Sequence, residues 1–483
     1  MTAPFARFRV LSLCVLLTAC ATTPARDIAR QVPMPPPAQP QSAPSGAPAP
    51  AAPVPPQAST AASPAAAGAA PSAGVQPIVY ATFEQWEANF HEKARAHGFS
   101  DDLVDSMLAG VQPLATVTAS DSQQPEFSKP TSTYIRTVVT QARIDATRAK
   151  LDANPNVPEI ERNFGVPACV LGGIWSMESD LGRVQGNIDV VAALATLAYN
   201  GRRRVWAEDE LLAVLTILRD NRVPRQTLKG SWAGAMGQTQ FEPDSYLKLG
   251  VDGDHDGKVD IWNSDSDALA STANLLSQAG WKPGEAWDVE VVLPAGFDYY
   301  LAETAKMTPD AWLLLGLRRA DGGAFTPQEM TETATLLLPS GANGPAFLAL
   351  PNHYVIRKYN NSTSYALGVG LIADGVCGKM SARTPWPVEP PLSLQQRIRT
   401  QQALKAAGFD PGSQDGVIGV NTRQAIRDWQ RANHLPADGY LSFALANAFV
   451  AQTNTGMTGG AAATPAITPD NPPSAPIPYR PGM

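Results

Sequence analysis

The sequence has few of the residues on which several common kinds of functional site depend. It contains four Cys and five His among 483 residues, and the Cys are too few and too scattered for a disulfide scaffold or a Cys-rich zinc module. The His are isolated and form no HExxH pair, so nothing indicates a zinc hydrolase. Charged residues make up only 17% of the chain, the net charge is −7, and no block of Lys or Arg occurs. There is therefore no electrostatic reason to expect a nucleic-acid partner.

Proline, in contrast, is abundant. The chain contains 44 Pro, close to double the average usage of about 5%. Many lie in residues 21–75, a stretch of Ala, Pro, Ser and Gln with almost no large apolar side chain. Such a segment buries too little surface to offset its ordering entropy, and its Pro content keeps it extended. We expect residues 21–75 to be a disordered tether and residues 452–483, which are similarly biased, to be a disordered tail.

The first 20 residues predict a destination in the bacterial envelope. Arg7 and Arg9 precede a short apolar run, residues 10–17, which has the layout of a signal peptide and is too short to span a bilayer as a mature helix. The run ends in LTAC, which resembles the bacterial lipobox, whose Cys becomes the lipid-bearing N-terminus. Residue 21 is Ala rather than the Asp of an inner-membrane retention signal. The resemblance implies a lipid on Cys20 and a periplasmic protein anchored to the outer membrane; an ordinary secretory signal is the alternative.

Residues 76–380 have the pattern of a mainly helical domain with a small β element. Apolar residues recur at three- and four-residue steps, which is typical of helices. Two strand-like patches, residues 286–294 and 344–360, interrupt the helical pattern. The predicted helices cover residues 83–98, 133–155, 158–182 with a helix start at Pro167, 189–199, 207–219, 265–280, 297–304, 308–318 and 363–376.

A compact unit follows a Pro-rich linker at residues 381–391. Residues 392–451 contain two amphipathic segments, at 393–407 and 420–433, separated by a Gly/Asp turn. Neither this unit nor the preceding domain shows an internal repeat. The sequence therefore predicts two folded domains between two disordered segments.

One carboxylate has the surroundings of a general acid. Glu178 lies in GGIWSMESDLG, at the C-terminal end of an otherwise apolar helix. Partial desolvation there raises the pKa of the carboxyl, and a carboxylic acid that stays protonated near neutral pH can donate a proton to a leaving oxygen. Asp180 points to a different helix face and is a poor partner. Spacing alone favours the plainer interpretation, a solvated Glu at a helix end.

Two long stretches give Glu178 a family context. IWSMESDLGRVQGNIDVVAALATLAYNGRRR (174–204) and LKGSWAGAMGQTQFEPDSY (228–246) resemble the lytic murein transglycosylase B family. The resemblance continues in co-linear order through several further segments, namely 83–113, 124–127, 256–262, 267–276, 280–281 and 350–370.

This resemblance implies a lysozyme-like α-helical domain that cleaves the bond from N-acetylmuramic acid (MurNAc) to N-acetylglucosamine (GlcNAc) in peptidoglycan. In such enzymes one Glu protonates the glycosidic oxygen and then takes the proton of the MurNAc 6-hydroxyl as that hydroxyl attacks the anomeric carbon. The product is a 1,6-anhydro sugar. No obvious second carboxylate lies beside Glu178 in the sequence, which agrees with this chemistry, because an ordinary glycosidase usually needs two carboxyl groups.

The resemblance also assigns site residues. It implies that Glu178 is the catalytic acid/base, that residues at the two ends of SWAGAMGQTQ line the sugar cleft, and that residues of YNNSTSY hold the substrate near Glu178 and support the charged intermediate. Taken singly, each of the latter is also compatible with a packing role. The residues assigned to substrate binding are Ser231 and Gln240 in the first motif and Tyr359, Asn360 and Tyr365 in the second.

An acidic loop predicts a structural calcium site. VDGDHDGKVDIW places three Asp at alternating positions before Gly257, as at the start of an EF-hand loop. The twelfth loop residue is Asn263 rather than the usual Glu, but members of the resembled family can close a longer loop with a later Asp. A solvated acidic turn is the alternative, and the chemistry itself needs no cofactor. The predicted ligands are Asp252, Asp254, Asp256, Lys258 through its carbonyl, and Asp267, with Asp265 as a rival.

The C-terminal unit is similar to the three-helix peptidoglycan-binding module. The similarity rests on the DGVIG turn, on Thr422 before AIRDWQ, and on LPADGYLS. Such a module holds an enzyme on its polymeric substrate and raises the local concentration of cleavable bonds. The signature positions, which we interpret as maintaining the fold, are Asp415, Gly416, Gly419, Trp429, Gln430 and Gly439.

Cys169 and Cys377 remain after removal of the signal. An oxidising periplasm permits a disulfide, but separation along the chain does not determine their geometry, so their pairing stays open. A Cys–His nucleophile is disfavoured because Cys169 lies at an apolar helix start without polar neighbours.

The sequence thus predicts a mainly α protein: a lysozyme-like catalytic domain with a small β element, and a three-helix peptidoglycan-binding domain. We expect a monomeric lytic transglycosylase acting on peptidoglycan glycan strands, with a lipid anchor in the outer membrane and no nucleic-acid partner. The alternatives are a muramidase that lets water attack and a wall-binding scaffold without activity. The expected segments are 1–20 signal peptide, 21–75 tether, 76–380 catalytic domain, 381–391 linker, 392–451 peptidoglycan-binding domain and 452–483 tail.

Overall fold

The structure is a computed structural model that describes residues 80–122, 130–220, 222–379 and 382–455. All the described residues belong to one compact unit of the chain. The predicted signal peptide with Cys20, the tether 21–75 and the motif at 124–127 lie outside the described residues. None of the described helices combines the length and the apolar composition needed to cross a bilayer.

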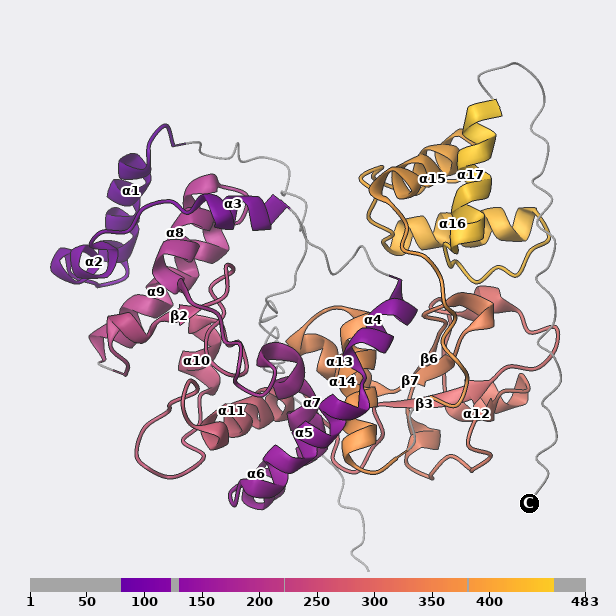
Figure 1. Ribbon diagram of the computed structural model, residues 1–483, viewed down its shortest axis with the longest axis horizontal. Helices are drawn as coiled ribbons and strands as arrows, with labels where there is room; N and C mark the ends of the chain where they lie inside the picture. The colour runs from indigo at the N-terminus through magenta and orange to yellow at the C-terminus, as the bar shows by residue number, and fades with distance from the viewer. Residues whose placement is uncertain (1–79, 123–129, 221, 380–381, 456–483) are drawn as a thin grey trace, which may run out of the picture. The chain divides into compact units, whose positions relative to one another are not determined.

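The larger body, which is the described part of residues 80–379, consists mainly of helices (Figure 1). Apolar residues from these helices form its core, and its largest fully buried side chains include Trp86 and Trp175. The helices are α1 (Phe83–Ala96), α2 (Asp101–Leu108), α3 (Ala115–Ser122), α4 (Thr131–Val138), α5 (Gln141–Ala153), α6 (Val157–Phe164), α7 (Ala168–Ser179), α8 (Val190–Asn200), α9 (Arg204–Arg219), α10 (Pro243–Leu249), α11 (Asp265–Gln278), α13 (Pro351–Tyr359) and α14 (Thr363–Val376).

The small β element is an antiparallel sheet with its own apolar core. Among the described residues its strand order is β4-β6-β7-β3-β5, and α12 (Pro309–Leu314) contributes the fully buried Trp312 to that core. A separate two-stranded pairing joins β1 (Ile188–Asp189) to β2 (Lys229–Gly230). The strands of the larger sheet are β3 (Asp288–Val292), β4 (Lys306–Met307), β5 (Arg318–Arg319), β6 (Ala334–Leu337) and β7 (Ala346–Ala349).

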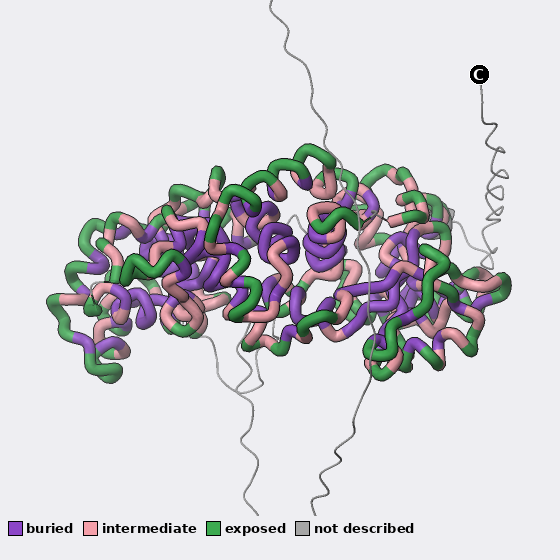
Figure 2. Tube along the Cα trace, turned by 90° about the horizontal axis from the view of Figure 1, so that it is seen from below, coloured by how far each residue is buried: buried purple, intermediate pink, exposed green. Residues whose placement is uncertain are grey.

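The C-terminal module consists of α15 (Leu394–Ala406), α16 (Val420–Ala432) and α17 (Phe443–Thr455) around a small core of its own. Trp429 packs on Phe449 in that core, with ring centroids 4.7 Å apart. α15 begins with a capping box in which Ser393 and Gln396 satisfy each other's backbone N–H groups. In Figure 2, the buried positions of the described residues lie mainly inside the fold and the exposed positions mainly on its outside.

Three local expectations are wrong. The predicted helix at 133–155 is broken, because Val139 leaves the helical conformation and Thr140 caps the start of α5. The second strand-like patch gives only the short strand β7 before α13 begins at Pro351, a residue suited to the first turn of a helix. The predicted helix at 297–304 is a single 3₁₀ turn, Tyr299–Leu301.

Two glycines allow α7 to lie against α5 and α14 (Figure 1). A Cβ on Gly173 would lie 2.8 Å from the Val369 carbonyl oxygen of α14. A Cβ on Gly172 would lie 2.6 Å from Cγ2 of Thr147 in α5. Both separations are too short for a side chain, so these glycines permit packing that offsets their usual cost of about 1 kcal/mol in a helix.

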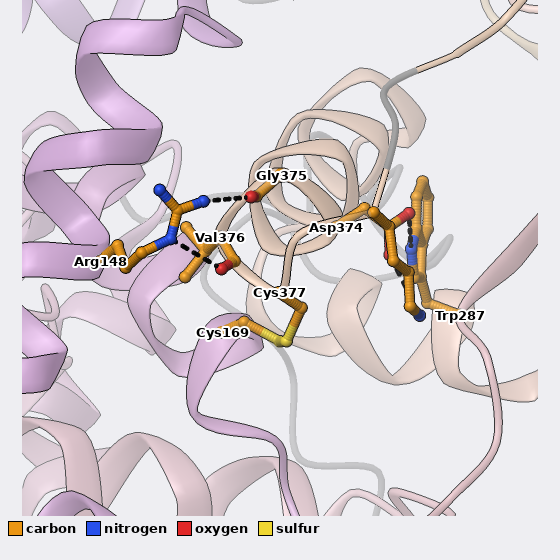
Figure 3. Close-up of a disulfide and its surroundings, with 8 residues drawn as sticks. Arg148, Cys169, Trp287, Asp374, Gly375, Val376 and Cys377 are labelled. Atoms are coloured by element: carbon orange, nitrogen blue, oxygen red, sulfur yellow. Dashed lines mark hydrogen bonds and ion pairs between the residues drawn. A yellow bond between two sulfur atoms is a disulfide. The ribbon is translucent and has the colours of Figure 1, made fainter.

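A disulfide joins the start of α7 to the end of α14, which answers the question of pairing that the sequence leaves open (Figure 3). Cys169 and Cys377 are bonded with their Cα atoms 5.8 Å apart. At the same end of α14, Arg148 of α5 donates hydrogen bonds to the carbonyl oxygens of Gly375 and Val376, at 2.6 and 3.1 Å. The end of α14 is therefore held by one covalent bond and two charge-assisted hydrogen bonds.

Candidate active site

Glu178 lies in the last turn of α7, where the helix emerges from the apolar core. Trp175, one turn earlier, is fully buried, and the helix ends after Ser179 because Asp180 takes a left-handed conformation with φ 54°. Glu178 keeps some exposed surface, but desolvation of its carboxyl raises its pKa to about 7. The carboxyl is therefore substantially protonated at neutral pH, as a general acid must be.

Tyr365 is the hydrogen-bond partner of Glu178. Its hydroxyl donates to Glu178 Oε1 at 2.5 Å, and this bond counteracts part of the effect of burial on the Glu178 pKa. Ser362 caps α14 by accepting from the Tyr365 N–H at 3.3 Å, which places Tyr365 in the first turn. α7 and α14 thus meet at two ends, through Glu178 and Tyr365 at one and through the disulfide at the other.

Tyr359 lies near Glu178 but holds a loop. Its hydroxyl donates to the Thr239 carbonyl oxygen, and its ring meets that of Phe241 edge to face, with centroids 6.2 Å apart. Burial and the nearby charge of Glu178 raise its pKa well above the ordinary value. Asn360 ends α13 and its carbonyl oxygen accepts the Ser362 N–H at 2.7 Å, so it shapes the turn into α14.

Ser231 and Gln240 both stabilise the backbone of the loop between them. Ser231 Oγ accepts N–H groups from Ala233 and Ala235, at 3.3 and 3.2 Å. Gln240 Nε2 donates to the carbonyl oxygens of Gln185 and Gly237, at 2.9 and 2.8 Å. The side chains of both are partly exposed, and their contact with sugar stays a prediction.

Gln238 is a residue that the sequence reasoning missed. It is buried, and its Oε1 accepts the indole N–H of Trp175 at 2.9 Å. Its carbonyl oxygen accepts the Ser179 hydroxyl, so Gln238 fixes both the helix that carries Glu178 and the loop 231–241. Its position inside the motif GQTQ was the available signal, but a buried Gln has no local pattern that reveals its partner.

In the part of the chain that the structure describes, no carboxylate is among the groups that shift the pKa of Glu178. The influences on its pKa are burial and the Tyr365 hydroxyl. Asp180 forms an ion pair with Arg183 instead. A lone acid/base supports chemistry in which a hydroxyl of the substrate itself is the nucleophile. Glycosidases with two carboxyl groups instead use the second carboxyl as the nucleophile or to activate a water molecule.

The predicted calcium loop brings three of its five predicted ligands together. Asp252, Asp254 and Asp256 each offer a carboxylate oxygen, and these oxygens lie within 4.8 Å of one another. Gly257, with φ 90°, turns the chain and donates its N–H to Asp252 Oδ2 at 2.8 Å. Lys258 follows directly and donates its N–H to Asp256 Oδ1 at 2.9 Å.

The later Asp residues are engaged elsewhere. Asp267 is buried, and its oxygens accept backbone N–H groups of Gly253, Asp254 and Asp260, at 2.8, 3.3 and 2.6 Å. Its rival, Asp265, forms an ion pair with Lys150 at 3.1 Å. Asp267 therefore stabilises the backbone of the loop through these hydrogen bonds.

A helical body that presents one partly buried glutamate with a raised pKa beside a tyrosine is suited to general acid–base chemistry. Comparisons with known proteins agree. The model of the transglycosylase SLT domain matches residues 82–374, and that of the putative peptidoglycan-binding domain matches residues 393–449. The chain belongs to the SLT-domain transglycosylase family.

Solved structures and a curated relative support this placement. SltB3 from Pseudomonas aeruginosa, in complex with NAG-anhNAM-pentapeptide, is 45% identical with a TM-score of 0.73, and the match covers 77% of this chain and 100% of that one. The Escherichia coli lytic transglycosylase SLT35 in complex with calcium is 29% identical with a TM-score of 0.53, over 63% of this chain and 98% of that one.

Membrane-bound lytic murein transglycosylase B of Escherichia coli is 34% identical over 225 residues, which are 44% of this chain and 58% of the relative. The match thus spans less than two thirds of that curated protein. Together with the structures, it confirms the predicted fold class and the prediction of a lytic transglycosylase with a peptidoglycan-binding domain.

Proposed function

We propose that this lytic transglycosylase cleaves the MurNAc-β-1,4-GlcNAc bond of peptidoglycan and leaves 1,6-anhydro-MurNAc ends, with Glu178 as acid and then base, for remodelling and turnover of the cell wall. The observation that carries the proposal is the Glu178 carboxyl, which has a pKa of about 7, accepts the Tyr365 hydroxyl, and has no second carboxylate among the described groups that shift its pKa. The relative SltB3 was solved with peptidoglycan fragments. Identifying the sugar ends of the products tests the proposal, because a hydrolase would add water.

The chemistry follows from the two protonation states of Glu178. The protonated carboxyl donates its proton to the glycosidic oxygen as the bond from MurNAc C1 to that oxygen breaks, and GlcNAc leaves. The Glu178 carboxylate then removes the proton of the MurNAc 6-hydroxyl while that oxygen bonds to C1. No water is consumed and Glu178 regains its proton. Because the Tyr365 hydroxyl donates to Oε1, it stabilises the carboxylate formed between the two steps.

Replacing Tyr365 by Phe is expected to lower kcat about tenfold, which corresponds to about 1.4 kcal/mol. Loss of the donor raises the pKa of Glu178, because the bond favours the charged form. Activity that requires protonated Glu178 falls as pH rises through this pKa, so the alkaline limb of the pH profile moves to higher pH. Measurement of kcat against pH checks this. Tyr299→Phe, in the β element, is the matched control, and an alkaline limb that stays in place would contradict the proposed role of Tyr365.

We further propose that the acidic loop binds calcium as a structural ion. Three carboxylates held within 4.8 Å of one another repel unless a cation lies between them, and an all-oxygen donor set suits calcium. The carbonyl of Lys258 would complete the set, with Asp267 bracing the loop. Calcium bound there would hold the loop ahead of α11 and would take no part in the chemistry.

Calcium is expected to raise the melting temperature of the wild-type protein, and a chelator is expected to lower it. At a calcium concentration 100 times the Kd the stabilisation would be about 2.7 kcal/mol. Asp254→Asn should abolish the calcium response, whereas Asp152→Asn, an exposed residue of α5, should keep it. Thermal unfolding with and without calcium provides the measurement. A calcium response that survives in Asp254→Asn would contradict the site.

The envelope location of the curated relative, a membrane-bound protein, supports a finer proposal for this chain. We propose that Cys20 carries a lipid, that the protein is anchored to the periplasmic face of the outer membrane, and that it acts as a monomer. Cys20→Ala is expected to move most of the protein from the membrane fraction to the soluble fraction and to prevent incorporation of a labelled fatty acid. Unchanged fractionation and labelling would exclude the anchor.

A further inference from the structure

A cavity of about 400 Å³ lies between the first turn of α14 and the C-terminal module. Ser364 lines it from the larger body, and Val417 and Tyr440 line it from the module. Ser364 directly precedes Tyr365, the partner of Glu178. The proposed mechanism gives this junction cavity no role, although one of its lining residues is the sequence neighbour of Tyr365.

Charged side chains of both signs line the junction cavity. Arg357, Arg397 and Arg423 line it, together with the acids Glu303 and Asp438. Glu303 already binds two guanidinium groups, those of Arg423 at 2.9 Å and of buried Arg427 at 2.7 Å. Burial raises the pKa of Asp438.

Asp438 is also fully engaged. One of its oxygens accepts the Ala342 N–H at 2.8 Å, and the other accepts donors from Gln430 and Tyr440, at 2.8 and 2.9 Å. Its carboxyl thus has little capacity left for an arginine.

Arg357 is the arginine with donor capacity to spare. Its Nη2 donates to Asn361 Oδ1 at 2.7 Å, whereas its Nε is buried and has no hydrogen-bond partner among the described residues. Desolvation lowers the pKa of Arg357, and its guanidinium also lies 5.9 Å from the ring centroid of Tyr354. A guanidinium with free donors in a fixed fork matches a carboxylate.

The start of α14, which follows the Arg357 partner Asn361, suits an anion as well. Ser362, Thr363 and Ser364 line the cavity at the N-terminus of α14, a 14-residue helix whose dipole favours negative charge at that end. The Ser364 hydroxyl lies 2.9 Å from that of Thr131. An anionic group in the cavity would therefore be able to meet both Arg357 and the hydroxyl groups at the start of α14.

We infer that the junction cavity binds a carboxylate of an acidic peptide, namely the peptide branch carried by MurNAc in peptidoglycan, with Arg357 as its main contact. The inference rests on the proposed function, because that function places a MurNAc unit at Glu178. The glycan bond would be cleaved beside Tyr365 while the peptide of the same or an adjacent MurNAc is held at the start of α14. Arg357 would then make the enzyme prefer peptide-bearing strands.

The test compares glycan strands that carry peptides with the same strands after an amidase has removed them, using the full chain. We expect Arg357→Gln to raise KM for peptide-bearing strands about tenfold, with kcat unchanged, and to change KM for stripped strands less than twofold. Arg399→Gln, at an exposed arginine of α15 that does not line the cavity, should match the wild type. Val417→Trp, at a 46% exposed position, should fill the cavity and reproduce the loss.

Two results would overturn the inference. If Arg357→Gln and Val417→Trp both keep the wild-type KM for peptide-bearing strands, the cavity does not bind the peptide. If Arg357→Gln weakens both substrates equally, the recognised group is the sugar or its lactyl carboxylate.

A direct binding experiment keeps the inference separate from the proposed function. A soluble tetrapeptide with free carboxylates is expected to bind Glu178→Gln protein, and its fully amidated form is not. The double variant Glu178→Gln, Arg357→Gln should lose binding about tenfold. Equal binding of the two peptides would overturn the inference. Absence of anhydro products from the wild type would overturn the proposed function and would leave this binding result standing.

Discussion

Glu178→Gln is expected to reduce the release of anhydro-muropeptides from purified sacculi by about 10³-fold, within the range by which general acid–base catalysis accelerates reactions. Gln has the shape of Glu, and its amide oxygen can still accept the Tyr365 hydroxyl, so the fold should be preserved. What it lacks is the proton for the glycosidic oxygen and the basic oxygen for the 6-hydroxyl. Mass spectrometry of the soluble products measures both the amount and the kind of sugar end.

The matched control is Asp180→Asn, which removes the neighbouring carboxylate that pairs with Arg183 and should leave activity within about twofold. Wild-type products heavier by one water would identify a hydrolase. If neither wild type nor Glu178→Gln releases products although both bind sacculi, the protein is a wall-binding scaffold, and the proposed mechanism is wrong.

The same substitution should also stabilise the protein at alkaline pH. Burial raises the pKa of Glu178 from 4.5 to about 7, so in the wild type the folded state loses stability as pH rises from the unfolded pKa to the folded one. Gln does not titrate and escapes this loss. We expect the free energy of unfolding of Glu178→Gln to exceed that of the wild type by about 1–3 kcal/mol at pH 8. At pH 4 we expect no such difference. Equal pH dependence of the two proteins would contradict the burial of this carboxyl.

Loss of the disulfide is expected to produce the largest change in stability. The bond between Cys169 and Cys377 spans a sequence separation of 208 residues, and closing so long a loop restricts the unfolded chain strongly. The double variant Cys169→Ala, Cys377→Ala should lower the free energy of unfolding by about 3–5 kcal/mol and the melting temperature by roughly 10 °C. Thermal unfolding of both proteins, with and without reductant, measures the effect.

Reductant should shift the wild type to the melting temperature of the double variant and leave the double variant unchanged. Because α7 and α14 also meet through Glu178 and Tyr365, and Arg148 still holds the end of α14, we expect the reduced protein to retain activity at low temperature. A wild type whose melting temperature ignores the reductant would contradict a stabilising bond.

Local patterns predicted much of the fold. The helix expected at 363–376 has those boundaries in the structure, and α7 begins directly after Pro167. Hydrophobic periodicity succeeded there because a long helix repeats its pattern several times. It failed for β4 and β5, which are two residues long and cannot display an alternation. It also failed for residues 344–360, where one apolar run serves a strand and then a helix.

The sequence by itself determined the fold class and the family and predicted Glu178 as the acid/base carboxyl, because motifs and periodicity are properties of neighbouring residues. Tertiary structure alone decided which distant groups meet: Tyr365 with Glu178 across 187 positions, Cys169 with Cys377 across 208, and the arginines of the junction cavity with α14. The physical reason is that such contacts depend on how closely packed helices align, which Gly172 and Gly173 permit but no local pattern specifies.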